Sequence, residues 1–496
     1  MTKRLRYVYE LLAKRWGFVV GVAMLLTFVL VLYLGKNQSV WFDESYSILL
    51  AKRPVGELLA LTNVDAHPPL SYLLLKVWGE LFGWTELALR SLSALLAVMA
   101  VGASALLVRR LYSPRVALAV LPFLVLAPFW LRYGYEIRMY ALAGLICVIA
   151  SLVLLKATAL HTSKKWWGVY AVLVALGMYT LYMTLVVWLA HAVWLFMNRK
   201  PQTPLYKQPG FLAYVAAVGL FLPQIPVFIY QMLHSALPGV GSAMTLNKLI
   251  SIFGMLVVYK PDWQIGGWLS LALFIVTVLF GVLYATVIHS KKYRSGLLFV
   301  TVLVVVPLIF YTLTSLPPRE PIFIERYMAH IALFVAMLIG LTAVLGWLAG
   351  RRRVAVVFSV GVLALSGFGV YHLSTVGNLN FERMQLPMTR EIRAELPCSS
   401  NTQVVADDPY TYIDSVYYLH DCNLVFYSKD DVAFEGGYAM LHGSDRRLGL
   451  ANDLSARTVV HLYWANIDKT FTVPDSYRLV SSKTYDQQVV EIYTRR

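Results

Sequence analysis

The chain has 496 residues, of which 58% are hydrophobic and only 14% are charged. Soluble domains carry roughly 25% charged residues, so this composition excludes an ordinary soluble protein. The formal net charge is +16, but the basic residues gather at alternate ends of long apolar runs. This distribution is the positive-inside pattern of membrane proteins and argues against a nucleic-acid-binding surface.

Apolar runs long enough to cross a bilayer recur through residues 1–373. We therefore expect a polytopic α-helical membrane domain with about eleven transmembrane helices. Residues 374–496 are polar, charged and rich in turns, which predicts a soluble α/β domain. The basic loops predict a plasma-membrane protein with a cytoplasmic N-terminus and an extracytoplasmic C-terminal domain.

The first apolar run, about residues 17–34, has basic flanks and no small-residue cleavage signature. We interpret it as a retained membrane span. Soon after it come Asp43 and Glu44, within the sequence WFDES. Two adjacent acids at the mouth of a span favour a functional role. The alternative is that Asp43 only caps the helix that begins there.

The first outer loop, about residues 35–85, alternates apolar and polar residues at helical spacing. This pattern predicts helices that lie along the membrane surface with their apolar faces down. Within the loop, the pair Pro68-Pro69 follows His67 and forbids a helix through that point. His67 is therefore held at a turn, either as a buried turn residue or as a ligand.

Two further polar clusters fall on the outer face. The turn after the third span contains Glu136 and Arg138, which are either site residues or an ion pair. A later loop contains Glu325 and Arg326, which either serve the site or anchor a span at the headgroups. All acids of residues 1–373 except Glu10 fall on this predicted outer face: Asp43, Glu44, Glu57, Asp65, Glu80, Glu86, Glu136, Asp262, Glu320 and Glu325.

These residue types suit the transfer of a sugar from a lipid phosphate. A carboxylate would accept the proton of the attacking hydroxyl group. Arginine would meet the leaving phosphate, because its planar fork matches phosphate oxygens. A divalent metal held by carboxylates or histidine would share that task.

The C-terminal part reads as strand, helix and strand, from TQVVADD through PYTYIDSVYYLHDC to NLVFYS. RTVVHLYW and QVVEIYT predict further strands. Cys398 and Cys422 each precede a strand of the predicted parallel βαβ unit, so both lie at the same end of the sheet. We predict a disulfide between them, the alternative being two unpaired thiols. Cys147 lies in an apolar run and is expected to serve packing.

Several stretches in order give the chain a family resemblance: WFDES, HPPLSYLLLKVW, LFGWTELALRSLSALLAV, RYGYEIRMYAL and FIERYMAHIALF. Over residues 1–373 the chain resembles GT-C superfamily glycosyltransferases. It is most similar to the bacterial group that is protein-O-mannosyltransferase-like and aminoarabinose-transferase-like, or glycosyltransferase family 39-like. The resemblance implies the GT-C fold and a polyprenyl-phosphate sugar as donor.

The resemblance also assigns roles to residues. It implies that Asp43 is the catalytic carboxylate, with Glu44 beside it. It implies that a group of outer-face residues contacts the substrates: His67, Glu136, Arg138, Tyr140, Arg326 and Tyr327. Some members bind a divalent ion, which would be Mg, Mn or Zn at Asp65 and His67, and no nucleotide cofactor is implied. Relatives often have a histidine in the turn that here reads Tyr179-Thr180-Leu181-Tyr182.

We therefore expect an enzyme, a hexosyl or pentosyl transferase that moves a sugar with inversion, with Asp43 as base. The acceptor would be an extracytoplasmic cell-envelope glycan, lipid or protein. The alternative function is a membrane transporter or flippase for a lipid-linked sugar. Such a protein would carry ionisable residues near its span centres, where His191 is the main example here. A tail that binds sugars on a membrane anchor would need only one span.

Overall fold

The computed structural model describes residues 10–36, 38–159, 164–199, 202–234, 265–316, 324–376, 389–396, 398–450 and 454–496, together with 245, 252 and 254–260. The chain packs as two compact units. The helical unit comprises Met1–Lys36, Arg90–Phe228 and Ala236–Thr375. The α/β unit comprises Asn37–Leu89, Ile229–Ser235 and Val376–Arg496. The domain boundary expected at residue 373 stays a prediction, but the packing joins the first outer loop to the C-terminal residues.

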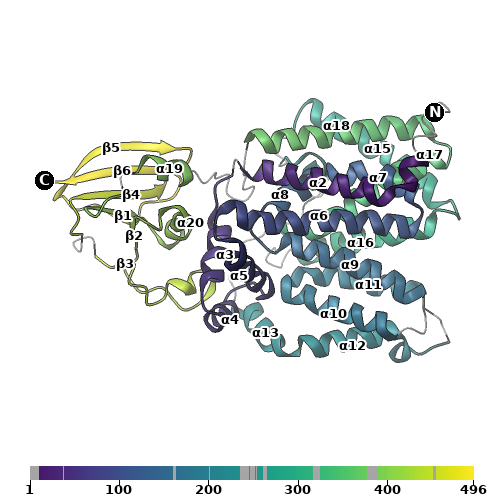
Figure 1. Ribbon diagram of the computed structural model, residues 1–496, viewed down its shortest axis with the longest axis horizontal. Coiled ribbons are helices and arrows are strands. Elements are labelled where there is room, and N and C mark those ends of the chain that lie inside the picture. The colour runs from purple at the N-terminus through teal and green to yellow at the C-terminus, as the bar shows by residue number, and fades with distance from the viewer. Residues whose placement is uncertain are drawn as a thin grey trace. The chain divides into compact units, whose positions relative to one another are not determined.

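The helical unit confirms a polytopic membrane protein (Figure 1). Among the described residues, eight helical segments are long and apolar enough to cross a membrane. They are α2 (Trp16–Lys36), α6 (Glu86–Leu111), α9 (Tyr140–Ala159), α12 with η3 and α13 (Pro209–Phe221, Leu222–Gln224 and Ile225–His234), α15 (Trp268–Ile288), α16 (Arg294–Thr314), η5 with α17 (Glu325–Ile331 and Ala332–Leu348) and α18 (Arg352–Val376).

The other expected spans are bent or short. α7 (Pro114–Val125) and α8 (Pro128–Gly134) together pass as one span bent by 67°. Pro128 has no backbone N–H to continue the helical ladder, which explains the break. α10 (Lys164–Thr180) and the pair η1 (Tyr182–Thr184) and α11 (Leu185–Met197) are shorter than a full span. For these segments, membrane crossing stays a prediction.

The helices differ in how far they face one another. In the span Glu325–Leu348, 83% of an 18-residue apolar stretch is buried, whereas in the span Trp16–Lys36 the share is only 22%, and large apolar side chains such as Phe18 and Leu26 are exposed. In α17, a Cβ added at Gly340 would lie 2.9 Å from the side chain of Val120 in α7. α17 is therefore a central helix, and α2 presents apolar side chains where lipid would lie.

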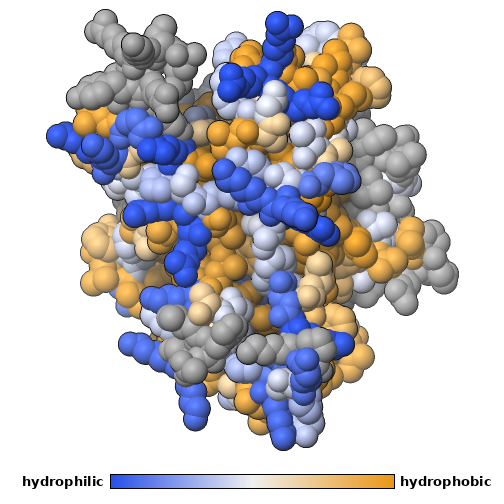
Figure 2. Space-filling model, turned by 90° about the vertical axis from the view of Figure 1, so that its right-hand side faces the viewer, coloured by the Kyte–Doolittle hydropathy of each residue, from blue (hydrophilic) through white to orange (hydrophobic). Residues whose placement is uncertain are grey.

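Basic residues mark one end of the helical unit. Figure 2 views the end where α6 finishes, and hydrophilic side chains are spread across it. Basic side chains in the last turns of helices include Arg109 and Arg110 of α6 and Lys156 of α9. This clustering fits the positive-inside pattern of the sequence.

The α/β unit begins with three short helices from the first outer loop. They are α3 (Phe42–Lys52), α4 (Val55–Val64) and α5 (Leu70–Phe82). The break between α4 and α5 falls where the proline pair predicts it. Their apolar faces lie in one core with the C-terminal domain, including Tyr46, Leu58 and Tyr72. The apolar faces predicted for the membrane surface are therefore covered by protein only in part, because α4 and α5 also leave apolar side chains such as Leu59, Val77 and Leu81 exposed.

The C-terminal domain contains a six-stranded sheet in the order β3-β2-β1-β4-β6-β5. Its strands are β1 (Thr402–Ala406), β2 (Asn423–Tyr427), β3 (Arg447–Leu448), β4 (Thr458–Trp464), β5 (Tyr477–Tyr485) and β6 (Gln488–Arg495). β1 pairs in parallel with β2 and β4, and β6 pairs antiparallel with β4 and β5. The βαβ unit and the strands predicted from the sequence are confirmed.

Two helices and a disulfide complete this domain. α19 (Thr389–Glu395) precedes β1, and α20 (Pro409–Leu419) connects β1 to β2. The side chain of Asp408 accepts the backbone N–H of Thr411 at 2.6 Å and so caps α20. Cys398 and Cys422 form the predicted disulfide, with their Cα atoms 5.1 Å apart.

Candidate active site

The adjacent acids of the first loop have different surroundings. Both lie in the first turn of α3, but Glu44 is 1% exposed whereas Asp43 is half-buried. The Glu44 Oε2 accepts the backbone N–H of Trp41 at 3.4 Å, so this carboxylate reaches back over the helix start. A carboxylate there accepts a hydrogen bond from a free N–H, and its negative charge interacts favourably with the positive end of the helix dipole. Glu44 therefore takes part in capping α3, and both roles considered for Asp43 stay predictions.

Asp65 and His67 lie in the break between α4 and α5. Asp65 is the C-cap residue of α4 and is 8% exposed, and His67 is half-buried. The last turn of α4 is tied down by Gln231, whose Nε2 donates to the carbonyl oxygen of Thr62 at 2.6 Å. Both residues thus stand on a fixed turn in the same unit as Asp43.

The acid of the second outer turn is half of a buried ion pair. Glu136 Oε2 lies 2.6 Å from Nη1 of Arg132, and their side chains are 1% and 4% exposed. The Arg132 guanidinium also lies over the rings of Tyr133 and Tyr135, at 5.3 and 5.1 Å from their centroids. Of the alternatives left open by the sequence, the ion pair is present, but its cation is Arg132.

Arg138 and Tyr140 follow in the same turn. Arg138 is half-buried, and its backbone N–H donates to the carbonyl oxygen of Glu136 at 2.7 Å. Tyr140 is fully buried, with its ring edge-on to Tyr133 at 5.0 Å between centroids. Tyr140 therefore belongs to a packed aromatic group, while the Arg138 side chain stays partly accessible.

The late outer loop continues into η5, which contains Arg326 and Tyr327. Arg326 is half-buried and Tyr327 is 4% exposed, and the carbonyl oxygen of Tyr327 accepts the hydroxyl of Tyr311 at 2.9 Å. η5 packs against α8 and α9, the two helices that flank Arg138. The helical unit thus places Arg138 and Arg326, the two arginines predicted to contact the substrates, on neighbouring elements.

Two buried arginines were not singled out from the sequence. Arg132 stands four residues before Glu136, a spacing typical of helical ion pairs that was available as a signal. Arg90 of α6 is 3% exposed, donates to the carbonyl oxygen of Gly35 and lies over the Tyr135 ring at 5.7 Å. Nothing in the local pattern around Arg90 identifies that partner, because Gly35 belongs to another helix.

The metal expected at Asp65 and His67 has few available ligands. In the part of the chain that the structure describes, no group of three or more histidine, cysteine, aspartate or glutamate side chains is arranged to hold a metal ion. Protein sites for zinc and similar ions supply at least three such ligands. The described residues therefore offer no zinc site of that kind. Magnesium needs only one or two protein carboxylates beside waters and substrate phosphates, so an ion of that type at Asp65 and His67 stays a prediction, and no chemical step is derived through a metal.

His191, the ionisable residue at a span centre, sits in a satisfied polar network. Its two ring nitrogens lie 2.9 Å from the Ser151 hydroxyl and 3.0 Å from the Tyr170 hydroxyl. The side chain is fully buried, and the Tyr170 hydroxyl lies 2.9 Å from that of Tyr214. This arrangement ties α9, α10, α11 and α12 together and indicates packing.

A cavity of about 790 Å³ lies elsewhere in the helical unit. Its walls are mainly apolar and include Leu155, Trp194 and Phe211, and Arg199 also lines it. Arg199 lies two residues after the end of α11, on the side where the sequence places basic inner loops. None of the predicted site residues lines this cavity.

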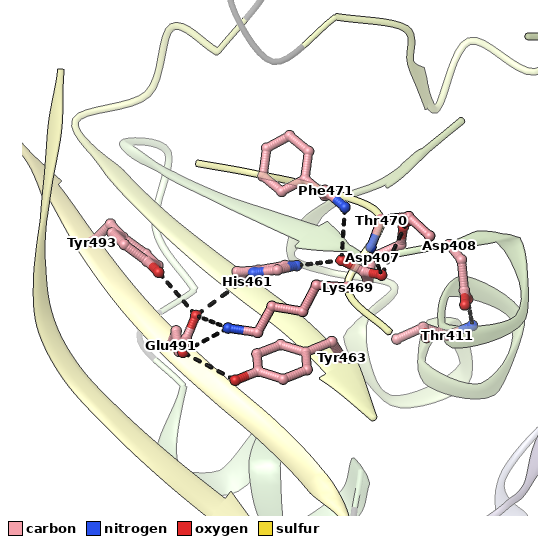
Figure 3. A network of polar contacts seen from close by, with 10 residues as sticks. All are labelled: Asp407, Asp408, Thr411, His461, Tyr463, Lys469, Thr470, Phe471, Glu491 and Tyr493. Carbon is pink, nitrogen blue, oxygen red and sulfur yellow. Dashed lines mark hydrogen bonds and ion pairs between the residues drawn. The ribbon is translucent and has the colours of Figure 1, made fainter. Parts of the chain in front are cut away.

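The C-terminal domain contains a buried polar cluster around Asp407 (Figure 3). Its Oδ1 lies 2.8 Å from Nε2 of His461, whose other ring nitrogen lies 3.8 Å from Oε2 of Glu491. The backbone N–H groups of Thr470 and Phe471 also donate to the Asp407 carboxylate, at 2.8 and 3.0 Å. These bonds hold the segment after β4 against the end of β1, which indicates a structural role.

Burial acts to raise the pKa of Asp407, but the hydrogen bonds outweigh it. The bond from His461 and the two backbone bonds hold the Asp407 pKa below its ordinary value. The cluster also includes Lys469, whose ammonium lies 3.0 Å from Glu491. The carboxylate of Asp407 is thus charged and paired, and it has no acidic proton to offer near neutral pH.

Comparisons with known proteins give matches in sequence and structure. Residues 66–230 match the family model described as dolichyl-phosphate-mannose-protein mannosyltransferase. Among solved structures, ArnT from Cupriavidus metallidurans bound to undecaprenyl phosphate has a TM-score of 0.61 at 15% identity, covering 96% of this chain and 98% of that one. Its apo state also has a TM-score of 0.61, at 14% identity, covering 97% of this chain and 98% of that one.

A third solved structure is the arabinofuranosyltransferase AftD from Mycobacteria. It has a TM-score of 0.51 at 14% identity, and the match covers 97% of this chain and 40% of that chain. A search of curated protein sequences gives no match. At these identities the structural matches establish the fold, which ArnT shares over nearly its whole length.

Proposed function

We propose that this chain, which has the GT-C glycosyltransferase fold, transfers a sugar from a polyprenyl-phosphate donor to an extracytoplasmic acceptor. The observation that carries the proposal is the match over almost all of both chains to ArnT bound to undecaprenyl phosphate. The match of residues 66–230 to a mannosyltransferase family that uses dolichyl phosphate supports the same donor chemistry. Both point to a sugar activated by a lipid phosphate.

Asp43 is the proposed base. Its carboxylate would take the proton of the acceptor hydroxyl as that oxygen attacks the anomeric carbon. The bond from that carbon to the phosphate oxygen breaks with inversion, and polyprenyl phosphate leaves. The half-buried position of Asp43 supports this role, because a base must be reachable by substrate. Glu44 is engaged at the helix start, so it contributes by holding that turn.

Arg138 and Arg326 are the proposed contacts of the phosphate. Each is half-buried, which lets a guanidinium keep its charge while presenting hydrogen-bond donors to a ligand. A bidentate contact to phosphate would offset the charge that develops as the lipid phosphate leaves. His67 and Tyr327 are proposed to shape the substrate sites, and Glu136 and Tyr140 to support the turn that carries Arg138.

We place the acceptor side outside the cytoplasm, with the N-terminus inside, on the strength of the basic inner loops. The sugar is a hexose or a pentose, and the acceptor is a cell-envelope glycan, lipid or protein. The chemistry needs no nucleotide, because the lipid phosphate already activates the sugar. A metal is left outside the proposed mechanism, since the described residues contain no group of three or more candidate ligands through which to derive a step.

The flippase alternative is less well supported. His191, the ionisable residue near a span centre, is buried in a network of hydrogen bonds that links four helices. A transport site would instead place accessible polar groups near the midplane.

The test is turnover of a panel of polyprenyl-phosphate sugars by purified protein in detergent. The proposal predicts that one donor is consumed and that free polyprenyl phosphate accumulates when acceptor is present. The anomeric configuration of the product, read by NMR, should be opposite to that of the donor. A flippase would consume no donor in detergent, because transport requires a sealed membrane.

A further inference from the structure

The segment that leads into α3 is buried but has no regular structure. Gln38, Ser39 and Val40 are 1%, 5% and 0% exposed and lie in neither helix nor strand. A buried irregular segment must find hydrogen-bond partners for its backbone outside itself. Its partners decide where the first turn of α3, and hence Asp43, is held.

Those partners come from the C-terminal domain of the same unit. The backbone N–H of Val40 donates to the hydroxyl of Tyr418 at 2.8 Å. Nη2 of Arg390 donates to the carbonyl oxygen of Gln38 at 2.6 Å. Val40 and Tyr418 are 378 residues apart in the chain, so the contact exists only because α20 packs on α3.

The same two side chains also bind Glu86, the first residue of α6. The Tyr418 hydroxyl donates to Oε2 of Glu86 at 2.8 Å, and Arg390 donates to Oε1 at 2.6 Å. Tyr418 thus uses its hydroxyl both as acceptor and as donor. Burial raises the pKa of Tyr418, so the hydroxyl keeps the proton that it donates. Tyr418 and Arg390 therefore link the segment before α3 to Glu86 at the start of α6.

A third contact lies on the other side of the segment. The ring of Phe42, next to Asp43, stacks on Tyr410 in the first turn of α20, with centroids 4.5 Å apart and planes at 11°. Asp43 therefore directly follows a segment that the C-terminal domain contacts at two residues, at Val40 through Tyr418 and at Phe42 through Tyr410. One helix of the C-terminal domain supplies both holds.

We propose that Tyr418 and Arg390 are positioning residues for Asp43, and that the C-terminal domain acts as the template which sets the base in place. The inference rests on the proposed function, in which Asp43 takes the acceptor proton. It gives the C-terminal domain a role in the chemical step that requires no contact with substrate. Displacing a catalytic group by about 1 Å costs on the order of 100-fold in rate. Loss of the Tyr418 or Arg390 contact should therefore be measurable as a lower turnover rate.

The test compares Tyr418→Phe with Tyr417→Phe in the full-length protein. Tyr417 is the neighbour on the same helix, and its hydroxyl also bonds the first loop, at the carbonyl oxygen of Trp84 at 3.1 Å. We expect Tyr418→Phe to lower kcat roughly 10- to 100-fold with donor KM unchanged. Tyr417→Phe should keep kcat within about twofold of the wild type. Equal losses in both variants would reduce Tyr418 to a structural residue.

Arg390 offers a rescue experiment. Arg390→Ala should lower kcat, and Arg390→Lys should restore most of it, because one ammonium can donate to both Gln38 and Glu86. The matched control is Arg393→Ala on the same helix, which removes an exposed ion pair to Asp421 at 2.5 Å. Failure of lysine to restore kcat, or an equal loss in the control, would overturn the assignment for Arg390.

Hydrogen exchange separates this inference from the proposed function. Tyr418→Phe should speed exchange in a peptide spanning residues 38–46 more than tenfold at Val40, and Tyr417→Phe should leave it unchanged. Unchanged exchange in Tyr418→Phe, or faster exchange with wild-type kcat, would overturn the positioning role. A wild type without donor turnover would refute the proposed function, and exchange would still decide whether Tyr418 holds the segment.

Discussion

The buried pair of Arg132 and Glu136 gives the sharpest test of the membrane unit's interior. The change is Glu136→Ala, which removes a carboxylate 2.6 Å from the guanidinium and leaves Arg132 buried with its charge. Loss of one partner of a buried ion pair costs about 3–5 kcal/mol. The rings of Tyr133 and Tyr135 near Arg132 offset part of this cost, so we expect about 3 kcal/mol.

The matched variant replaces both partners, as Arg132→Met with Glu136→Leu. Removing both charges leaves no unpaired ion, so stability should return to within about 1 kcal/mol of the wild type. The measurement is thermal unfolding of detergent-solubilised protein, followed by intrinsic fluorescence. A loss below about 1 kcal/mol in Glu136→Ala, or a double variant no more stable than the single one, would refute the reasoning.

The same variants separate architecture from chemistry at this turn. If the pair only supports the turn that carries Arg138, the double variant should keep most of the donor turnover. A double variant that is stable but inactive would mean that Arg132 or Glu136 contacts substrate, as the family resemblance implies for Glu136.

Three further predictions concern the α/β unit. Asp407→Asn should destabilise the C-terminal domain by about 1–3 kcal/mol at neutral pH. Because the folded pKa of Asp407 is lowered, the stability that its carboxylate contributes is present above about pH 4 and is lost as pH falls through the folded pKa. The unfolding curves of variant and wild type should therefore converge in acid, and a constant difference between them would contradict this. Replacing Cys398 and Cys422 by serine removes a disulfide across a separation of 24 residues and should lower the free energy of unfolding by about 3 kcal/mol. An unchanged midpoint of thermal unfolding would contradict a stabilising bond. Glu44→Gln should keep turnover within about tenfold because its amide oxygen still accepts the Trp41 N–H, while a loss as large as that of Asp43→Asn would make Glu44 catalytic.

The local features of the C-terminal domain were predictable. Residues of β1, α20 and β2 carry their own pattern of alternation and turns, so the βαβ unit follows from the sequence. The disulfide follows in turn, because parallel strands begin at the same end of a sheet. The short β3 and the exposed β5 were missed, since two residues give no period and β5 exposes most of its length.

The features that bear on the site were only partly predictable. Apolar spacing in α3, α4 and α5 reports that each has a face to bury, but not what covers it. Part of that cover is the C-terminal domain, hundreds of residues later in the chain. Likewise, the acid at position 136 was visible as a candidate, but its partner Arg132 was passed over in favour of Arg138. Periodicity reports local geometry, and long-range packing decides which partner a buried charge finds.

The turnover of Asp43→Asn tests most directly whether Asp43 is the base. The matched control is Glu57→Gln in the same loop, where the acid forms an exposed ion pair with Arg53 at 3.0 Å. With the donor found in the panel, we expect Asp43→Asn to bind polyprenyl phosphate as tightly as the wild type and to lose roughly 100- to 10,000-fold in kcat. Glu57→Gln should match the wild type. If Asp43→Asn keeps most of its turnover, Asp43 is not the base and the central claim is wrong.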